Sequence, residues 1–197
     1  PYLKSVTIPE GVEEIGWAAF EKTTLETVNI PSSVKRIETY AFNECRKLKN
    51  VTISEGVEVI GNAAFAATAL ESVNIPSSVK IIETHAFNGC RLLKNVVISE
   101  GVMYFGVSVF ESTALEEVVL PSSVQYISDL VFYNCIKLKK VTFKSNNLVY
   151  YGDWVFLSCN NIEVFVPSES VDFYSNWLSQ YSNITCLLYT SPSPRDL

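Results

Sequence analysis

Residues 25–46 read Leu-Glu-Thr-Val-Asn-Ile-Pro-Ser-Ser-Val-Lys-Arg-Ile-Glu-Thr-Tyr-Ala-Phe-Asn-Glu-Cys-Arg, and variants of this stretch recur along most of the chain. Each copy has a leucine followed by Val-x-Ile, and then a valine, an isoleucine and a phenylalanine in fixed order. A pattern that recurs with a period of about 20–50 residues indicates a repeat architecture. The phenylalanines, which are spaced by 22 to 24 residues, are Phe20, Phe42, Phe65, Phe87, Phe110, Phe132 and Phe156. We count seven copies and part of an eighth.

Odd and even copies differ, so the longer period is two copies. Residues 24–68 and 69–113 differ at 15 of 45 positions and are identical at the other 30. This similarity indicates duplication of a two-copy unit. Copying of this kind repeats the same side chains in every unit, whereas a catalytic site requires one group of residues that differs from the rest of the array.

Each copy is typical of one coil of a solenoid. The Leu-x-x-Val-x-Ile stretch alternates with the period of a β-strand, and Pro31, Pro76 and Pro121 follow strand ends, where loss of an amide donor is tolerated. We expect an extended crossing at Val-x-x-Ile and a helical or 3₁₀ turn at Ala-Phe-x-x-Cys. A coil buries too little apolar surface to fold alone, so stability must come from stacking, with neighbouring strands parallel and about 4.8 Å apart.

Composition excludes several functional classes. The 197 residues are 48% hydrophobic, and the net charge of −6 argues against a nucleic-acid partner. No apolar run is long enough to predict membrane insertion. The single histidine, His85, has no carboxylate or cysteine beside it in the pattern. We therefore predict no metal, no cofactor and no enzymatic activity.

The motif Leu-x-x-Val-x-Ile-Pro-x-x-Val-x-x-Ile-x-x-x-Ala-Phe-x-x-Cys resembles the BspA-like, Treponema pallidum type leucine-rich repeat. The resemblance runs from Leu3 to about Val166, some four-fifths of the chain. It implies a leucine-rich repeat solenoid with about 22–23 residues per coil, a parallel β-sheet on one face and short extended or 3₁₀/helical turns on the other. It also implies a cell-surface or secreted repeat that binds host or neighbouring-cell proteins.

The chain divides into three predicted segments. Residues 1–166 form the repeat array, and residues 167–185 resemble the segment that closes such arrays; the latter carries an aromatic cluster that we expect to cover the last coil. Residues 186–197 resemble a translated sequencing adapter, so we expect a non-native tail; the alternative is a native Ser/Pro-rich linker. The chain opens at Pro1 without a leader, so a signal peptide is either cleaved or outside this fragment.

Four cysteines stand three residues after a repeat phenylalanine, namely Cys45, Cys90, Cys135 and Cys159. The other copies have threonine there. Cys45 and Cys90 are two coils apart, beyond the ~7 Å reach of a disulfide. Cys135 and Cys159 lie on neighbouring coils and could reach each other, but stacked side chains point the same way. We expect buried free thiols.

Two sets of residues are candidates for binding a partner. On the back crossing, one outward position becomes apolar toward the C-terminal end, and Met103 lies alongside it. The residues that predict a partner-binding surface there are Ile81, Met103, Tyr104, Tyr126 and Tyr150. The alternative is an aromatic ladder that covers only its own coil edges. On the strand face, Asn29, Thr52 and Asn74 belong to a small, polar, outward-facing column suited to a protein ligand.

A charge ladder follows the strand leucines, with alternating signs at Lys4, Glu26, Lys49, Glu71, Lys94, Glu116 and Lys139. It is either register support between coils or a charged binding strip. Taken together, these features predict a monomeric, non-catalytic module for protein–protein recognition or adhesion. The alternative is a mechanical spacer that presents domains outside this fragment.

Overall fold

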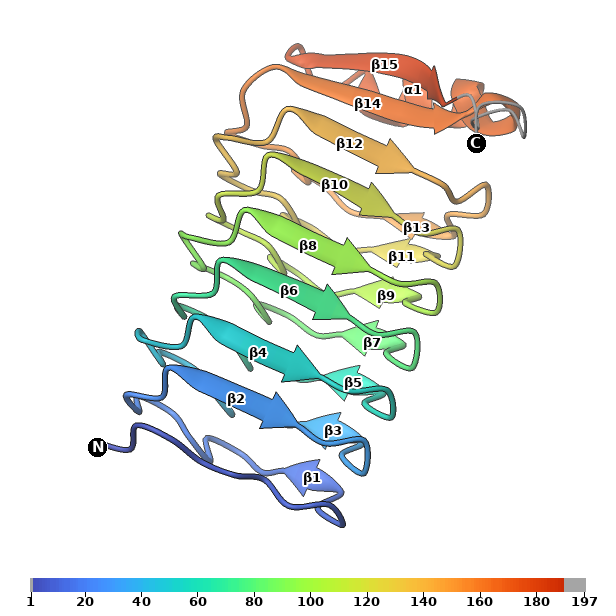
Figure 1. Cartoon of the computed structure of the whole chain (residues 1–197). Coiled ribbons are helices and arrows are strands. Elements are labelled where there is room, and N and C mark those ends of the chain that lie inside the picture. Colours follow the sequence, from blue (N-terminus) through green and yellow to red (C-terminus); the bar gives the residue numbers. More distant parts are fainter. Residues whose placement is uncertain (1, 190–197) are drawn as a thin grey trace, which may run out of the picture.

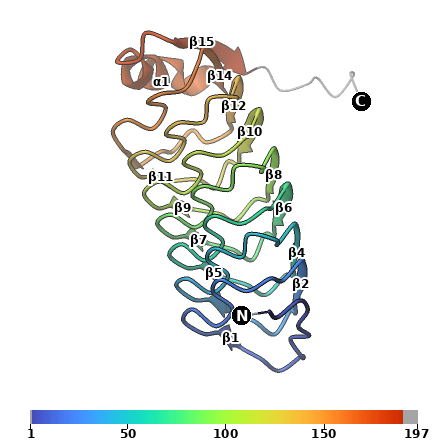
Figure 2. The same cartoon turned by 90° about the vertical axis from the view of Figure 1, so that its left-hand side faces the viewer.

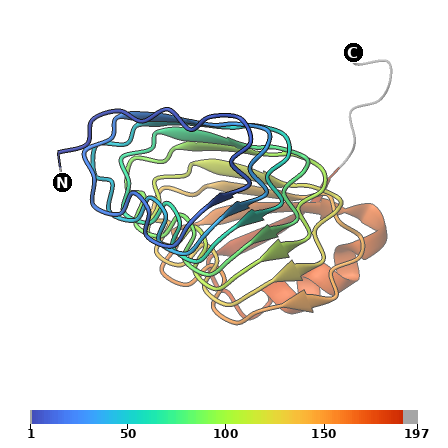
Figure 3. The ribbon, with the colours of Figure 1, turned by 90° about the horizontal axis from the view of Figure 1, so that it is seen from below.

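The repeated pattern folds as coils stacked along one axis, and the six coils from β2 to β13 each contribute one strand to the front face and a shorter strand to the back (Figure 1). The computed structural model describes residues 2–189. The front strands are β2 (Thr27–Ile30), β4 (Asn50–Ile53), β6 (Ser72–Ile75), β8 (Asn95–Ile98), β10 (Glu117–Leu120), β12 (Lys140–Phe143), β14 (Ile162–Pro167) and β15 (Ile184–Tyr189). Seen from below, successive coils have similar outlines and are displaced steadily from one to the next (Figure 3). The predicted leucine-rich repeat solenoid is confirmed.

The back crossings pair into one continuous parallel sheet of seven strands, which we call the back sheet (Figure 2). Its strands are β1 (Glu14–Ile15), β3 (Arg36–Ile37), β5 (Val59–Ile60), β7 (Ile81–Ile82), β9 (Tyr104–Phe105), β11 (Tyr126–Ile127) and β13 (Tyr150–Tyr151). In each of the first six, the second residue is buried and the first faces outward, except that Val59 is also buried. The extended crossing expected from Val-x-x-Ile is therefore present.

The expected helical or 3₁₀ turn at Ala-Phe-x-x-Cys is wrong. Two residues per coil there adopt left-handed backbone, such as Tyr40 at φ 59° and Glu44 at φ 54°, and single left-handed residues interrupt a helix. The amides of Tyr40, Phe42 and Glu44 instead donate to carbonyls of the next coil at 2.7–2.8 Å. The amides of one coil thus donate hydrogen bonds to the next coil, because backbone polar groups that are buried away from water must find partners.

The repeat phenylalanines form one row through the core. Ring centroids of successive members lie 5.2–5.7 Å apart, and all six pairs from Phe20–Phe42 to Phe132–Phe156 are stacked. Every member after Phe20 is fully buried. The leucine, valine and isoleucine columns surround this row, so the coils share one continuous apolar interior, as the periodicity predicts.

Coils of two kinds alternate along the axis. Type A coils begin at Leu3, Leu48 and Leu93 and carry threonine three residues after the phenylalanine; type B coils begin at Leu25, Leu70 and Leu115 and carry cysteine. From a B coil to the following A coil, the front strands are hydrogen-bonded in register, as in β2–β4 and β6–β8. The last B coil pairs in the same way, through β10–β12, with the coil that begins at Leu138 and carries Cys159 in place of threonine. Within residues 2–189, β4 is not hydrogen-bonded to β6, nor β8 to β10.

Proline accounts for part of this interruption. At the B-to-A junctions, the residue after the front strand donates its amide to the preceding coil, as Ser54 does to Ile30 at 3.2 Å and Ser99 to Ile75 at 3.1 Å. Type B coils have proline at this position, for example Pro76, and proline has no amide hydrogen to donate.

The A-to-B junctions are bridged by side chains instead. The carboxylate of Glu55 accepts hydrogen bonds at 3.0–3.2 Å from the amides of Ser77 and Ser78 and from the Ser77 hydroxyl. Ser78 Oγ accepts from the Gly56 amide at 2.9 Å and donates to the Val57 carbonyl at 2.7 Å. Glu100 contacts Ser122 and Ser123 in the same way one two-coil unit later.

The B-to-A junctions are close backbone contacts that require glycine. A Cβ on Gly56 would lie 2.0 Å from the Ser32 carbonyl oxygen, and one on Gly106 would lie 2.4 Å from the Thr84 amide nitrogen. Gly56 also has a left-handed φ of 121°, which favours glycine. Gly16, the counterpart of Gly106 in the first coil, has open space where a Cβ would lie.

At the C-terminal end, a 3₁₀ turn, η1 (Ser168–Ser170), leads into α1 (Val171–Leu178) beside the last coil (Figure 1). Trp177 packs 5.7 Å from Phe143 and 6.3 Å from Phe156, centroid to centroid, and Tyr174 donates a hydrogen bond to the Ser145 carbonyl at 2.8 Å. Strand β15 then pairs in parallel with β14. The segment predicted as a non-native tail begins within β15, and its residues 190–197 lie outside the described residues.

Candidate protein-interaction surface

The outward column of the back sheet changes character along the axis. Strand pairing places its members in one row, from β1 to β13: Glu14, Arg36, Val59, Ile81, Tyr104, Tyr126 and Tyr150. At the N-terminal end the row is charged, and Arg36 forms an ion pair with Glu38 at 2.6 Å. At the C-terminal end the exposed residues are apolar or aromatic. We call Ile81, Met103, Tyr104, Tyr126 and Tyr150 the tyrosine stripe.

The tyrosine stripe is accessible over most of its length. Ile81 and Met103 are each 38% exposed and Tyr150 is 49% exposed, whereas Tyr104 is half-buried. A tyrosine side chain presents an apolar ring and keeps its hydroxyl in water, whereas Ile81 and Met103 are apolar throughout. This accessible surface can therefore bury apolar area against a partner.

Neighbouring members of the stripe also contact one another. The rings of Tyr104 and Tyr126 are 6.2 Å apart between centroids, tilted by 44°, and Ser128 Oγ donates a hydrogen bond to Tyr104 Oη at 3.4 Å. The carboxylate of Asp129, followed by burial and by Asp153, raises the pKa of Tyr150. Its hydroxyl therefore remains a neutral hydrogen-bond donor at physiological pH.

The second candidate set lies on the front face. Asn29, Thr52 and Asn74 all point outward and are exposed, and Asn29 stands directly opposite Thr52 in the β2–β4 register. Asn74 is paired with Val97 on β8. The structure does not bring the two candidate sets together, because one lies on the front strands and the other on the back sheet (Figure 3).

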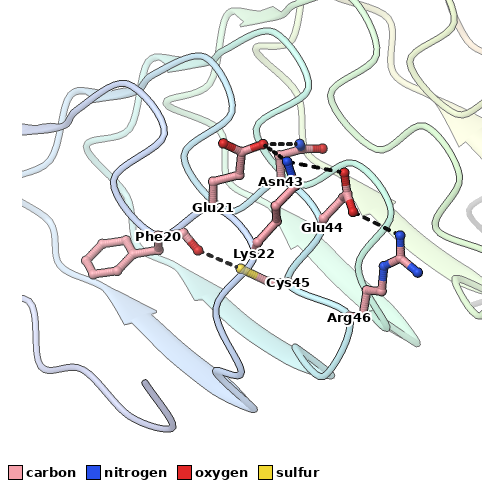
Figure 4. A network of polar contacts seen from close by, with 7 residues as sticks. All are labelled: Phe20, Glu21, Lys22, Asn43, Glu44, Cys45 and Arg46. Carbon is pink, nitrogen blue, oxygen red and sulfur yellow. Dashed lines mark hydrogen bonds and ion pairs between the residues drawn. The ribbon is translucent and has the colours of Figure 1, made fainter. Parts of the chain in front are cut away.

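The four repeat cysteines are buried free thiols, as expected. Cys45 Sγ donates a hydrogen bond to the carbonyl of Phe20, one coil earlier, at 3.0 Å (Figure 4). Thr68 and Cys90 side chains lie 3.2 Å apart across an A-to-B junction. Burial raises the pKa of Cys90 to about 11 and that of Cys159 to about 12. These thiols stay protonated at neutral pH and are poor nucleophiles.

The remaining chemistry-bearing residues are dispersed. Within residues 2–189, no three His, Cys, Asp or Glu side chains are grouped so that they could hold a metal ion. His85 occupies one of the left-handed turn positions, at φ 59°. Over the same residues, no helix combines the length and the apolar character needed to cross a bilayer.

The structure has a pair of depressions that the residue patterns did not predict. They lie along the corner where each coil enters its front strand. Arg91 lies between them, and Leu92 and Ile136 are exposed on their walls. The available signal was the extra residue of type B copies, which follows the cysteine and precedes the next leucine.

Stacked coils with parallel front strands and a buried leucine column define a leucine-rich repeat solenoid. The family model for the "BspA type Leucine rich repeat region (6 copies)" matches residues 1–94 and 58–185. The chain belongs to this family. Leucine-rich repeat proteins of this kind are generally protein-interaction modules, and their fold is typically non-catalytic.

Three solved structures show the same architecture. A leucine-rich repeat protein from Bacteroides ovatus is 28% identical with a TM-score of 0.77 and covers 94% of this chain and 49% of its own length. The T. pallidum leucine-rich repeat protein is 25% identical with a TM-score of 0.60, over 80% of this chain and 84% of that one. A leucine-rich cell surface protein from Faecalibacterium prausnitzii is 23% identical with a TM-score of 0.53, over 84% and 62%.

The chain thus spans about half of the Bacteroides protein, at 49%, and less than two thirds of the Faecalibacterium protein, at 62%. Among curated proteins, none matches the sequence.

Proposed function

We propose that this array is a monomeric recognition module of a cell-surface or secreted protein, and that it binds a protein partner through the tyrosine stripe. The observation that carries the proposal is the exposed apolar row of Ile81, Met103, Tyr126 and Tyr150 on a sheet whose N-terminal end is charged. Family membership supports the general role of protein interaction, and the resemblance to surface repeats supports the location.

The physical argument rests on what the stripe gains on binding. Tyrosine and methionine are enriched at the centres of protein interfaces, and tyrosine buries a large area with little loss of conformational freedom. Tyr126 and Tyr150 also carry hydroxyls that can exchange water for partner hydrogen bonds. Asn29, Thr52 and Asn74 on the front face supply a second, polar contact surface in this proposal.

The alternative is a spacer, in which the tyrosines only support one another. The contact between Tyr104 and Tyr126 favours it, because the two rings already cover part of each other. A spacer needs no exposed apolar row, however, and Ile81 and Tyr150 remain 38% and 49% exposed.

Binding to intact cells separates the two functions. Fluorescently labelled full chain is added to bacterial and epithelial cells and measured by flow cytometry, with excess unlabelled chain to define saturable binding. Recognition predicts saturable binding that protease treatment of the cells removes. The variant Tyr126→Ser/Tyr150→Ser should lose most of it, whereas the matched control Glu14→Ser/Arg36→Ser, at the charged end of the same row, should retain it.

Equal binding by the two double variants would reject the tyrosine stripe as the contact surface. Absence of saturable binding to any tested cell, together with unchanged melting of all variants, would favour the spacer.

A further inference from the structure

The corner between the phenylalanine turn and the front strand differs between the two kinds of coil. In type B coils, two residues separate the cysteine from the next leucine, and they occupy the centre of a tight turn. The turn closes with hydrogen bonds of 2.9–3.0 Å from the amides of Leu48, Leu93 and Leu138 to the carbonyls three residues earlier. Type A coils have a single residue there. The B corners therefore carry exposed residue pairs, while Thr24, Ala69 and Ala114 are half-buried or buried.

This alternation leaves depressions between successive B corners. The first, of about 400 Å³, has Arg46 on one wall, Arg91 and Leu92 on the other, and Thr68 and Ala69 at its base. Each wall is an exposed turn of a B coil, and the base is the shorter A coil between them.

The second depression, of about 330 Å³, repeats this arrangement one two-coil unit further along. Arg91 now forms the near wall, Ile136 and Lys137 the far wall, and Thr113 and Ala114 the base. Arg91 therefore borders both depressions.

The depressions are basic on an acidic protein. The chain has a net charge of −6, yet the residues that line the two depressions include Arg46, Arg91 and Lys137 and no carboxylate. An anionic group is the complementary ligand for such a surface.

The two arginines differ in availability. Arg46 is held by Glu44 at 2.9 Å, and Glu44 also approaches Lys22 at 3.7 Å (Figure 4). In the next B coil, Gly89 stands where Glu44 does, and within residues 2–189 Arg91 forms no ion pair. Arg91 is thus a cation with its five donors free for a carboxylate.

The spacing of the depressions indicates the conformation of the ligand. Two coils correspond to about 10 Å, from the ~4.8 Å separation of neighbouring strands. In a polyproline II segment, every third residue falls on the same side and recurs at about 9.3 Å. In a β-strand, side chains on one side recur at about 6.6 Å, which does not match.

We propose that this corner binds a polyproline II segment of a protein partner with an acidic residue at every third position. Arg91 binds a carboxylate of the segment, and Lys137 binds the next one. Leu92, at 48% exposure, and Ile136, at 56%, contact the proline or apolar residues between the acids. These exposed apolar walls favour a peptide over a sulfated glycan, whose anionic groups would leave them uncovered.

The proposed site is separate from the tyrosine stripe, since it lies on the corner that leads into the front strands and not on the back sheet. The probe is a fluorescein-labelled repeat of Glu-Pro-Pro, and fluorescence anisotropy with the full chain measures its affinity. The comparison peptides are the Gln-Pro-Pro repeat and a peptide of identical composition with irregularly spaced glutamates.

We expect the Glu-Pro-Pro repeat to bind and to weaken as salt rises, and both comparison peptides to bind at least about fivefold more weakly. Arg91→Gln should reduce affinity by about tenfold. The matched double variant Glu44→Gln/Arg46→Gln removes a paired cation together with its carboxylate and should change affinity by less than about threefold. Tyr126→Ser/Tyr150→Ser should leave peptide affinity unchanged, which separates this site from the proposed function.

Equal binding of the irregular peptide would overturn the spacing argument. No loss of affinity in Arg91→Gln, in a chain that melts like the parent, would overturn the role of Arg91. Binding of a heparin fragment without any binding of the peptide would assign the corner to a glycan and reject the proposal.

Discussion

The two kinds of junction in this solenoid hold neighbouring coils together by different means. At a B-to-A junction, the front strands form a backbone ladder and glycines such as Gly106 allow close backbone contact. At an A-to-B junction, the front ladder is absent among the described residues, and side chains such as Glu55 bridge the coils. The phenylalanine row and the back sheet continue through both.

This difference gives a physical meaning to the two-copy period. An A coil presents a glutamate and threonine to the next B coil, and a B coil presents serines and cysteine in return. The two coil types are complementary, so we infer that a two-coil unit can be duplicated without loss of contacts. Because the longer B corners recur with the same period, the depressions between them recur as well.

The largest expected effect comes from breaking a B-to-A junction. Gly106→Ala places a methyl group 2.4 Å from the Thr84 amide nitrogen, and this backbone cannot move aside without disturbing its own contacts. We expect a loss of about 2–3 kcal/mol in the free energy of unfolding, measured by urea titration. The matched control Gly16→Ala meets open space and should be within about 1 kcal/mol of the parent. Similar losses for both variants would contradict the close contact.

A smaller effect is expected from removing one side-chain bridge at an A-to-B junction. Thr68→Val keeps the shape of the side chain but removes the hydroxyl that lies 3.2 Å from Cys90 Sγ. We expect a loss of about 1 kcal/mol in urea titration. Thr52→Val, on the exposed front face, is the control and should change little. If Thr68→Val unfolded at the same urea concentration as the parent, the contact between Thr68 and Cys90 would contribute nothing to the free energy of unfolding.

Acid should weaken the A-to-B junctions selectively. The amide of Ser77, which donates to the Glu55 carboxylate, lowers the pKa of that carboxyl group. A folded pKa below the unfolded value means that the contribution is fully present above about pH 4.3 and is lost as the pH falls through the folded pKa. Glu55→Gln should therefore lower the melting temperature at pH 7, and the difference should shrink below pH 4. A difference that does not depend on pH would contradict a charged Glu55 at this contact.

The smallest expected effect concerns the charge ladder. Its members are exposed, and among the described residues none is within ion-pair distance of another ladder residue. Lys49→Glu places three glutamates in succession and should cost about 0.2–0.5 kcal/mol at low salt. The readout is the melting temperature with and without added salt. An unchanged melting temperature at low salt would remove the ladder as register support.

The sequence was sufficient for the solenoid, the coil length and the buried columns, because each depends on apolar residues that recur with one period. It did not predict the conformation of the turns, since Leu130 and Trp154 adopt left-handed backbone without any glycine or asparagine signal. The tyrosine stripe could be placed on one sheet from its spacing, because a two-residue strand with one buried residue must turn the other outward.

The junctions were not predictable in the same way. Pro76 follows a strand end, as expected. The sequence did not show that its counterpart, Ser99, donates its amide to the preceding coil. A list of copies does not show which neighbour each residue contacts, and the contacts of Glu55 depend on the order in which the coils stack. The corner depressions depend in addition on a difference of one residue between adjacent coils.

Amide hydrogen exchange measured residue by residue by NMR tests the alternation of junctions most directly. Lys94, at a B-to-A junction, and Lys139, at the equivalent junction after the last B coil, donate their amides to the preceding coil at 3.0 and 2.8 Å. The amides of Glu71 and Glu116, at the same position of A-to-B junctions, have no backbone acceptor within residues 2–189. After correction for intrinsic rates, the two lysine amides should exchange at least about tenfold more slowly than the two glutamate amides. Equal protection at all four positions would contradict the existence of two kinds of junction.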